Sequence, residues 1–206
     1  MWIKICGCRR PEDAAAAAAS GADAFGLVLA PGFRRSLTVQ EAARLRSAAP
    51  GGLLAVGIFV AQPVAEVAAT AAAGGLDGLQ LHGAGAEAVA HLLRGRYRIL
   101  RAWDMQEPEP AGGDWLHLEP GARQGGGTGR AWDWSGLALR RPRRPFVLAG
   151  GLTPETAAGA CAAAEPDGVD VSSGVETDGR KDPEKIARFC QAVRRWQHAR
   201  AAADLA

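Results

Sequence analysis

The sequence lacks three features that would place it in a specialised class of protein. It has no run of about 18 apolar residues, so no membrane-spanning helix is expected. Its 24 basic and 22 acidic residues leave a formal charge of +2, without the strong basic excess of a dedicated nucleic-acid binder. The apolar part of "MWIKICGCRR" is too short for a signal peptide. We therefore predict a soluble cytoplasmic protein that binds neither nucleic acid nor membrane.

Metal-binding and disulfide patterns are also missing. The four cysteines, Cys6, Cys8, Cys161 and Cys190, show no C-x-x-C spacing typical of a zinc site or a redox pair. Cys6 and Cys8 are too close in sequence for an ordinary disulfide, which predicts free thiols in a reducing compartment. No second histidine lies at ligand spacing from His82, so no metal site is predicted.

The chain is expected to form one domain. Its 206 residues, 48% of them hydrophobic, are enough for one sizeable core. No Ser/Gly linker interrupts the sequence, and the alanine run 14–19 is better explained as helix-forming sequence than as disorder. We assign residues 1–200 to the domain and expect residues 201–206 to be a frayed tail.

Short apolar runs alternate with alanine-rich amphipathic segments along the chain. The apolar runs predict eight strands, at 2–6, 24–29, 53–60, 78–81, 98–103, 115–119, 145–149 and 168–171. The segments between most of them predict helices at 11–20, 39–48, 63–73, 86–94, 154–163 and 183–199. Residues 104–114 leave little room for a fifth helix, and the sixth should be short, near 133–139.

Alternating strands and helices indicate parallel pairing. Eight such units in about 200 residues predict a single-domain (β/α)₈ barrel near the lower size limit, with a missing or reduced fifth helix. An open doubly wound sheet is the alternative, because periodicity does not show closure.

Polar residues gather where the predicted strands end, which is where barrel enzymes carry their chemistry. They are Cys6, Arg34 and Arg35, Gln80 and His82, Glu119, and the stretch "DVSSG" that begins at Asp170. Gly150 and Gly151 precede a predicted helix, and Ser172, Ser173 and Gly174 offer amides and hydroxyls from the neighbouring strand. Together these last five residues predict a phosphate-binding cradle.

Seven motifs carry a resemblance to a known family. They are "KICG", "GADAFGLVLAPGFRRSLT", "VGIFV", "LQLHG", "GGTGRAWDW", "LAGGLTPE" and "VDVSSGVETDGRKD". In this order and spacing the sequence resembles the phosphoribosylanthranilate isomerases of tryptophan biosynthesis. The resemblance implies an Amadori rearrangement of a small phosphorylated substrate without metal or organic cofactor. We expect a monomer.

The resemblance also implies roles for individual residues. Cys6 is the general base, and Arg35 faces the anthranilate carboxylate, where a planar guanidinium can engage both oxygens. Lys4, two residues before Cys6 and on the same face, either lowers the pKa of the thiol or pairs with Asp170 on the neighbouring strand. Gln80 and Asp170 are expected to bind substrate. His82 either contacts substrate or is a satisfied structural histidine.

Glu119 departs from the family pattern. The family has an aspartate as general acid seven residues before a G-G-[ST]-G stretch, and here that position holds Glu119, longer by one methylene. His117 should also point into the barrel, either bonded to Glu119 or satisfied elsewhere.

Three functions follow as alternatives. They are an active isomerase using Cys6 and Glu119, another phosphosugar isomerase such as those of histidine biosynthesis, and a barrel that binds phosphorylated ligands or a partner protein without catalysis. The second class resembles enzymes with paired aspartates, whereas the first strand here ends in cysteine.

Overall fold

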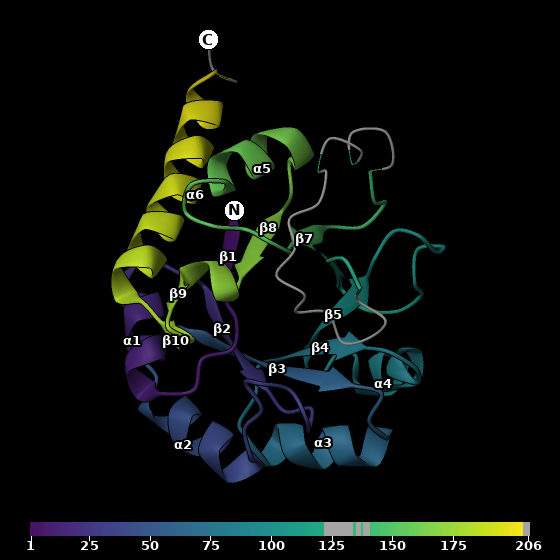
Figure 1. The fold of residues 1–206 in the computed structure, drawn as a ribbon. Coiled ribbons are helices and arrows are strands. Elements are labelled where there is room, and N and C mark those ends of the chain that lie inside the picture. Colours follow the sequence, from purple (N-terminus) through teal and green to yellow (C-terminus); the bar gives the residue numbers. More distant parts are fainter. Residues whose placement is uncertain (122–133, 135–136, 138–140, 204–206) are drawn as a thin grey trace.

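Eight parallel strands close into a barrel in the computed structural model, which describes residues 1–121, 134, 137 and 141–203 (Figure 1). The strands are β1 (Trp2–Ile5), β2 (Ala24–Val28), β3 (Leu54–Val60), β4 (Gly78–His82), β5 (Arg98–Trp103), β6 (Trp115–Leu118), β7 (Phe146–Leu148) and β8 (Gly168–Val171). Strand β1 pairs with both β2 and β8, so the sheet has no open edge. The predicted barrel is confirmed, and the open-sheet alternative is wrong.

Helices cover the outside of the barrel (Figure 1). In the described part of the chain they are α1 (Pro11–Ala19), α2 (Val39–Ala48), α3 (Val64–Ala73), α4 (Ala86–Leu93), α5 (Ala157–Ala164) and α6 (Pro183–Ala203). Helix α6 packs against both α1 and α5, so the last helix closes the outer ring against the first. The described residues 104–114 between β5 and β6 form no helix, as the sequence predicts. The short sixth helix predicted near 133–139 lies mostly outside the described residues.

The strands are buried on both faces because helices cover them outside and side chains fill them inside. All five residues of β4 are buried, for example, and so is every residue of β8. Apolar side chains such as Ile3, Ile5 and Phe25 belong to the main hydrophobic core, whereas Lys4, between Ile3 and Ile5, is polar and fully buried. Alternation along one strand therefore supplies both the core and the polar groups of the barrel interior.

Two helices, α5 and α6, have bounds that differ from the prediction by more than one residue. Helix α5 begins at Ala157 instead of residue 154, because Thr153 and Thr156 bond each other in a turn, the Thr153 amide donating to Thr156 Oγ1 at 2.9 Å. Helix α6 continues to Ala203, so residues 201–203 are helical where a frayed tail is expected. Arg200 Nη1 lies 2.9 Å from Glu165 Oε1 and ties the last turns to α5.

A small feature after β8 is absent from the prediction. A 3₁₀ turn at Ser173–Val175 leads into a two-stranded antiparallel hairpin of β9 (Glu176–Thr177) and β10 (Arg180–Lys181). The hairpin places Glu176 and Lys181 beside the barrel mouth. Within the described ranges, no helix has both the length and the apolar character needed to cross a membrane.

Candidate active site

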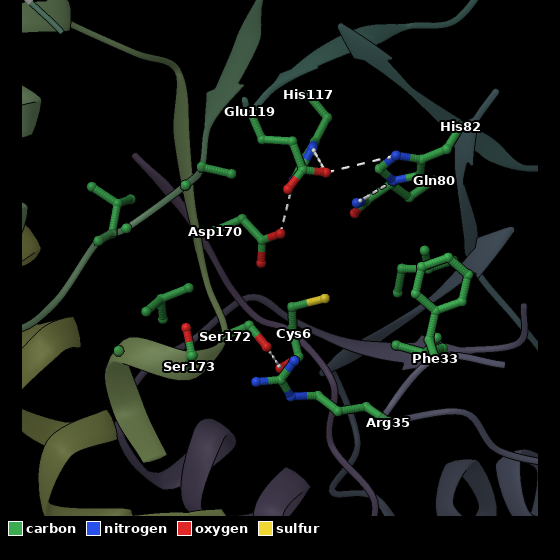
Figure 2. A pocket seen from close by; sticks show the side chains of 18 of the residues that line it. Cys6, Phe33, Arg35, Gln80, His82, His117, Glu119, Asp170, Ser172 and Ser173 are labelled. Atoms are coloured by element: carbon green, nitrogen blue, oxygen red, sulfur yellow. Dashed lines mark hydrogen bonds and ion pairs between the residues drawn. The ribbon is translucent and has the colours of Figure 1, made fainter. Parts of the chain in front are cut away.

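A pocket with a volume of about 220 Å³ opens at the C-terminal ends of the strands (Figure 2). Its lining contains every residue that the sequence analysis proposes for the site: Cys6, Arg35, Gln80, His82, Glu119, Gly150, Gly151, Asp170, Ser172, Ser173 and Gly174. These residues come from distant parts of the sequence, and the closed barrel brings them together.

Lys4 and Asp170 form a buried ion pair beneath the pocket. They are register partners on β1 and β8, and Lys4 Nζ donates to Asp170 Oδ2 at 2.8 Å. Burial disfavours the charge on Asp170, but Lys4 and a hydrogen bond from His117 outweigh it and hold the pKa of Asp170 at about 2, below its ordinary 3.8. The structure supports both roles that the sequence leaves open for Lys4: it pairs with Asp170, and it also acts to lower the pKa of the Cys6 thiol.

Cys6 follows β1 directly and lies opposite Gly26 on β2. A Cβ atom at Gly26 would come within 2.9 Å of Cys6 Sγ, so the missing side chain makes room for the thiol. Burial raises the pKa of the Cys6 thiol above its ordinary 9.0, and the nearby charge of Lys4 offsets only part of this effect. Cys6 is therefore a partly buried thiol that is protonated at neutral pH.

Glu119 faces two histidines. Glu119 Oε1 lies 3.6 Å from Nδ1 of His82 and 3.6 Å from Nδ1 of His117. Nε2 of His117 forms a hydrogen bond with Asp170 Oδ2 at 2.8 Å. Nε2 of His82 lies 3.0 Å from Gln80 Nε2. His117 therefore donates its hydrogen bond to Asp170 and only faces Glu119, because 3.6 Å is too long for a hydrogen bond.

His82 and His117 lie 35 residues apart in the sequence, which is not a metal-ligand spacing, yet the fold brings their rings together. Their ring centroids are 6.1 Å apart. Strands β4 and β6 are alternate strands, and side chains from alternate strands share a layer inside a barrel. Sequence spacing does not reveal this proximity.

Arg35 is held by an acidic partner that the sequence analysis missed. Its Nε and Nη2 atoms donate to the two carboxylate oxygens of Glu176 at 2.7 and 2.9 Å. Arg34 and Lys181 also donate to Glu176, at 2.7 and 2.8 Å. Burial disfavours the charge on Glu176, but the hydrogen bonds from Arg35, Lys181 and Arg34 outweigh it and lower the pKa of that carboxyl well below its ordinary 4.5. The motif "VETDGRKD" contains the partners, but only the hairpin shows where they lie.

Backbone groups dominate the side of the pocket formed after β7 and β8. Gly150 and Gly151 have φ angles of 87° and 68°, a conformation that other residues rarely adopt. A Cβ atom at Gly174 would overlap with the carbonyl oxygen of Leu152, so the two loops touch through their backbones. The Ser172 hydroxyl donates to the Cys6 carbonyl at 3.0 Å and ties the loop to β1.

The opposite side of the pocket is apolar, and the sequence analysis did not identify it. Val28, Phe33, Ile58 and Val60 line it, and Phe33 is 37% exposed. An exposed aromatic ring beside a polar pocket can pack against a planar ligand. The signal in the sequence was Phe33 itself, next to the two arginines.

The barrel, with a pocket of buried ionisable groups at the C-terminal ends of its strands, defines a (β/α)₈ enzyme. The sequence profile of the family described as N-(5'phosphoribosyl)anthranilate (PRA) isomerase matches residues 3–192. The N-(5'-phosphoribosyl)anthranilate isomerase of Acidithiobacillus ferrooxidans is 43% identical, with 93% of this chain and 97% of the relative covered. The enzyme of the same name from Magnetococcus marinus is 40% identical, with 95% and 96% covered.

Solved structures agree. TrpF from Jonesia denitrificans has a TM-score of 0.83 and 38% identity, with 96% of this chain and 98% of that chain covered. Phosphoribosyl anthranilate isomerase from Thermotoga maritima has a TM-score of 0.83 and 31% identity, with 94% and 98% covered. The chain belongs to the N-(5'-phosphoribosyl)anthranilate isomerase family. It is an isomerase of tryptophan biosynthesis.

Proposed function

We propose that the pocket converts N-(5-phosphoribosyl)anthranilate to 1-(2-carboxyphenylamino)-1-deoxyribulose 5-phosphate by an Amadori rearrangement, with Cys6 as general base and Glu119 as general acid. The observation that carries the proposal is that both side chains point into one cavity from different strands (Figure 2). A 30% identical phosphoribosyl anthranilate isomerase, with a TM-score of 0.81 and 94% of this chain and 98% of that chain covered, was solved with the reduced form of this product.

The reaction needs one acid and one base. Protonation of the furanose ring oxygen by Glu119 lets the C1–O bond break, with the anilino nitrogen supplying the electron pair that forms a Schiff base. Cys6 then removes the C2 proton, and those electrons neutralise the iminium nitrogen to give an enolamine. Tautomerisation moves a proton from the C2 hydroxyl to C1 and leaves the ketone. No atoms are gained or lost.

Lys4 helps Cys6 to act as a base. Its ammonium group favours the thiolate, although burial keeps the pKa of Cys6 raised overall. Because Asp170 holds Lys4 at 2.8 Å, the charge stays in place while the thiol gains and loses its proton. The pair acts on Cys6 by position and charge.

Polar groups around the pocket can hold the rest of the substrate. Asp170 Oδ1 and Gln80 Oε1 are buried and have no hydrogen-bond partner in the described part of the chain, so each can accept from a sugar hydroxyl. His82, beside Glu119, lies within the same pocket and completes this polar side. These three residues bind the ribose in our proposal.

The two ends of the substrate carry negative charge. Arg35 receives the anthranilate carboxylate, with Glu176 holding the guanidinium in place and Phe33 offering its face to the aromatic ring. The phosphate lies against the amides and hydroxyls of Gly150, Gly151, Ser172, Ser173 and Gly174. This arrangement spans the pocket from its apolar side to its backbone-lined side.

A barrel that binds the phosphosugar without turning it over is the competing function, favoured by Glu119 in place of the family aspartate. Purified protein should isomerise phosphoribosylanthranilate and rescue a tryptophan auxotroph. Cys6→Ser should lower kcat by a factor of about 10² or more, since a hydroxyl is a far weaker base at neutral pH. His91→Gln, on the exposed side of α4, is the matched control and should keep full activity.

Wild-type protein that binds substrate without converting it would overturn the isomerase in favour of the binding function. Near-normal turnover in Cys6→Ser would instead remove Cys6 from the mechanism.

We also propose a cytoplasmic monomer. All four cysteines are free, as expected in a reducing compartment. Among the described residues, the exposed large hydrophobic side chains are Phe33, at the pocket, and Leu92. A relative from Thermotoga maritima, 29% identical with a TM-score of 0.79, was solved as monomers generated from a dimeric enzyme. Light scattering in solution measures the state of this chain.

A further inference from the structure

Three buried side chains at the mouth of the barrel present metal-ligating atoms to one another. His82, His117 and Glu119 each offer one ligand atom, and these three atoms lie within 4.8 Å of one another. All three residues are less than a tenth exposed. Two imidazoles and one carboxylate on alternate strands form a compact donor set that the sequence spacing does not show.

Two of the three distances match those between ligands of one small metal ion. Zinc–nitrogen and zinc–oxygen bonds of about 2.0–2.2 Å at tetrahedral angles separate neighbouring ligand atoms by about 3.4 Å. Glu119 Oε1 lies 3.6 Å from each of the two Nδ1 atoms. The third separation, between the histidine nitrogens, is within 4.8 Å, so side-chain adjustments would complete the site.

The Nε2 atom of each histidine, on the side of the ring away from Glu119, has a polar neighbour. His117 Nε2 bonds Asp170 Oδ2 at 2.8 Å, and Asp170 is itself paired with Lys4. A carboxylate on the far nitrogen fixes the ring and puts the lone pair on Nδ1, as in many metal sites. His117 Nδ1 is buried and has no hydrogen-bond partner among the described residues.

Gln80 can play the same role for His82. Its Nε2 atom lies 3.0 Å from His82 Nε2, while its own Oε1 is buried without a hydrogen-bond partner in the part of the chain described. Turning the amide over would place this oxygen at His82 Nε2, satisfy it with the ring N–H, and put the histidine lone pair on Nδ1. Both rings can thus aim a lone pair at the oxygen of Glu119.

We propose that His82, His117 and Glu119 form a binding site for a divalent transition metal such as Zn²⁺ or Co²⁺. Each of the three residues can present a lone pair to an ion placed between them. Two imidazoles and one carboxylate suit these metals, and a three-residue set leaves a coordination position open toward the pocket. The ion is a ligand of the site, separate from the acid–base chemistry.

Metal binding has a consequence for the reaction, and this part alone rests on the proposed function. Coordination takes the carboxylate of Glu119, which then no longer delivers a proton to the ring oxygen. Zn²⁺ should therefore inhibit turnover, and chelator should restore it. Binding itself is measured without substrate, so it stands or falls independently of the isomerase assignment.

The test uses Co²⁺ as a spectroscopic probe and Zn²⁺ in calorimetry with the purified chain. One equivalent of Co²⁺ should give visible d–d bands typical of low coordination, without the near-ultraviolet charge-transfer band of a thiolate ligand. His117→Gln and Glu119→Gln should each weaken Zn²⁺ binding by at least about 10-fold, with folding checked by circular dichroism. His91→Gln, which removes an exposed histidine on α4, should bind as the wild type does.

Absence of stoichiometric binding in the folded wild type would overturn the proposal. So would undiminished Zn²⁺ affinity in His117→Gln, because the ion would then lie elsewhere. A thiolate band that disappears in Cys6→Ser would also overturn the three-residue set, since Cys6 would then be a ligand.

Discussion

Proton transfer at Cys6 is a property of a single residue and its immediate neighbours. Cys6 is partly buried, and desolvation raises the pKa of its thiol above the ordinary 9.0 while Lys4 opposes the rise. In the proposed mechanism the thiolate is the base, and a raised pKa leaves only a small fraction of Cys6 in that form at neutral pH. The proposed reaction therefore depends on the protonation state of Cys6.

This predicts how the Cys6 thiol titrates. Because its pKa is raised, the rate at which iodoacetamide alkylates Cys6 should climb from neutral pH to above pH 9, without a plateau near pH 7. Alkylation at this position should vanish in Cys6→Ser. Mass spectrometry of the labelled protein at each pH, with circular dichroism to check folding, measures it; a plateau near pH 7 would show that the pKa of Cys6 is not raised.

Glu119 is the second test at this scale. Glu119→Gln keeps size and polarity but removes the proton, so kcat should fall by a factor of about 10² or more. Glu119→Asp restores the family side chain in a barrel where His82 and His117 contact the longer one. A displacement of about 1 Å can lower the rate strongly, so a less active aspartate variant would indicate that the strand end has adapted to glutamate.

Full activity in Glu119→Gln would transfer the acid role to another group, such as Asp170, a second carboxyl that lines the pocket. Comparing kcat with KM in each variant separates loss of chemistry from loss of binding.

The loops after β7 and β8 act together as one element. Their backbones touch where Gly174 lies against the carbonyl of Leu152, so neither loop can move far without the other. Helix α5 begins only at Ala157, and the glycine turn before it forms much of the pocket wall. The proposed anion-binding surface is therefore mostly backbone, which substitution elsewhere changes little.

Inorganic phosphate should compete with substrate for this surface, because exposed amides favour any compact dianion. Gly151→Val should mainly raise KM, since Gly151 has a positive φ that a branched side chain resists. Gly159→Ala, on α5 with open space around it, is the matched control and should leave KM unchanged. No competition by phosphate together with normal KM in Gly151→Val would show that the cradle lies elsewhere.

At the scale of the whole molecule, the Lys4–Asp170 pair joins the first strand to the last where the barrel closes. Each partner is almost fully buried, and the two lie on paired strands. Asp170→Asn should lower the free energy of unfolding by about 3–5 kcal/mol, because it leaves the Lys4 charge buried without compensation. A Lys4→Met, Asp170→Asn double variant should recover part of that loss.

The Lys4–Asp170 pair should also make the free energy of unfolding depend on pH. The pKa of Asp170 is depressed from 3.8 to about 2, so its contribution is complete above about pH 4 and is lost as the pH falls toward 2. Denaturant unfolding of wild type and Asp170→Asn between pH 2 and 7 measures this. Equal stability of the two proteins at pH 7 would contradict the structural role of the pair.

The sequence by itself determined the eight barrel strands and most of the helices around them. Periodicity predicted the helix at 39–48 and the strand at 98–103 with their observed bounds. Position at strand ends then identified Cys6, His82 and Glu119 as pocket residues. These predictions succeeded because the burial pattern of a strand is a local property. The apolar positions in a strand indicate which of its faces are buried, irrespective of which element buries them.

Only the tertiary structure decided which of these residues meet. The Lys4–Asp170 contact joins positions 166 residues apart, and closure of the barrel is what makes their strands neighbours. The approach of His82 to His117, and of Arg35 to Glu176, depends likewise on which elements lie side by side. Hydrophobic periodicity carries no information about such neighbours, because the same pattern would bury the same faces in an open sheet.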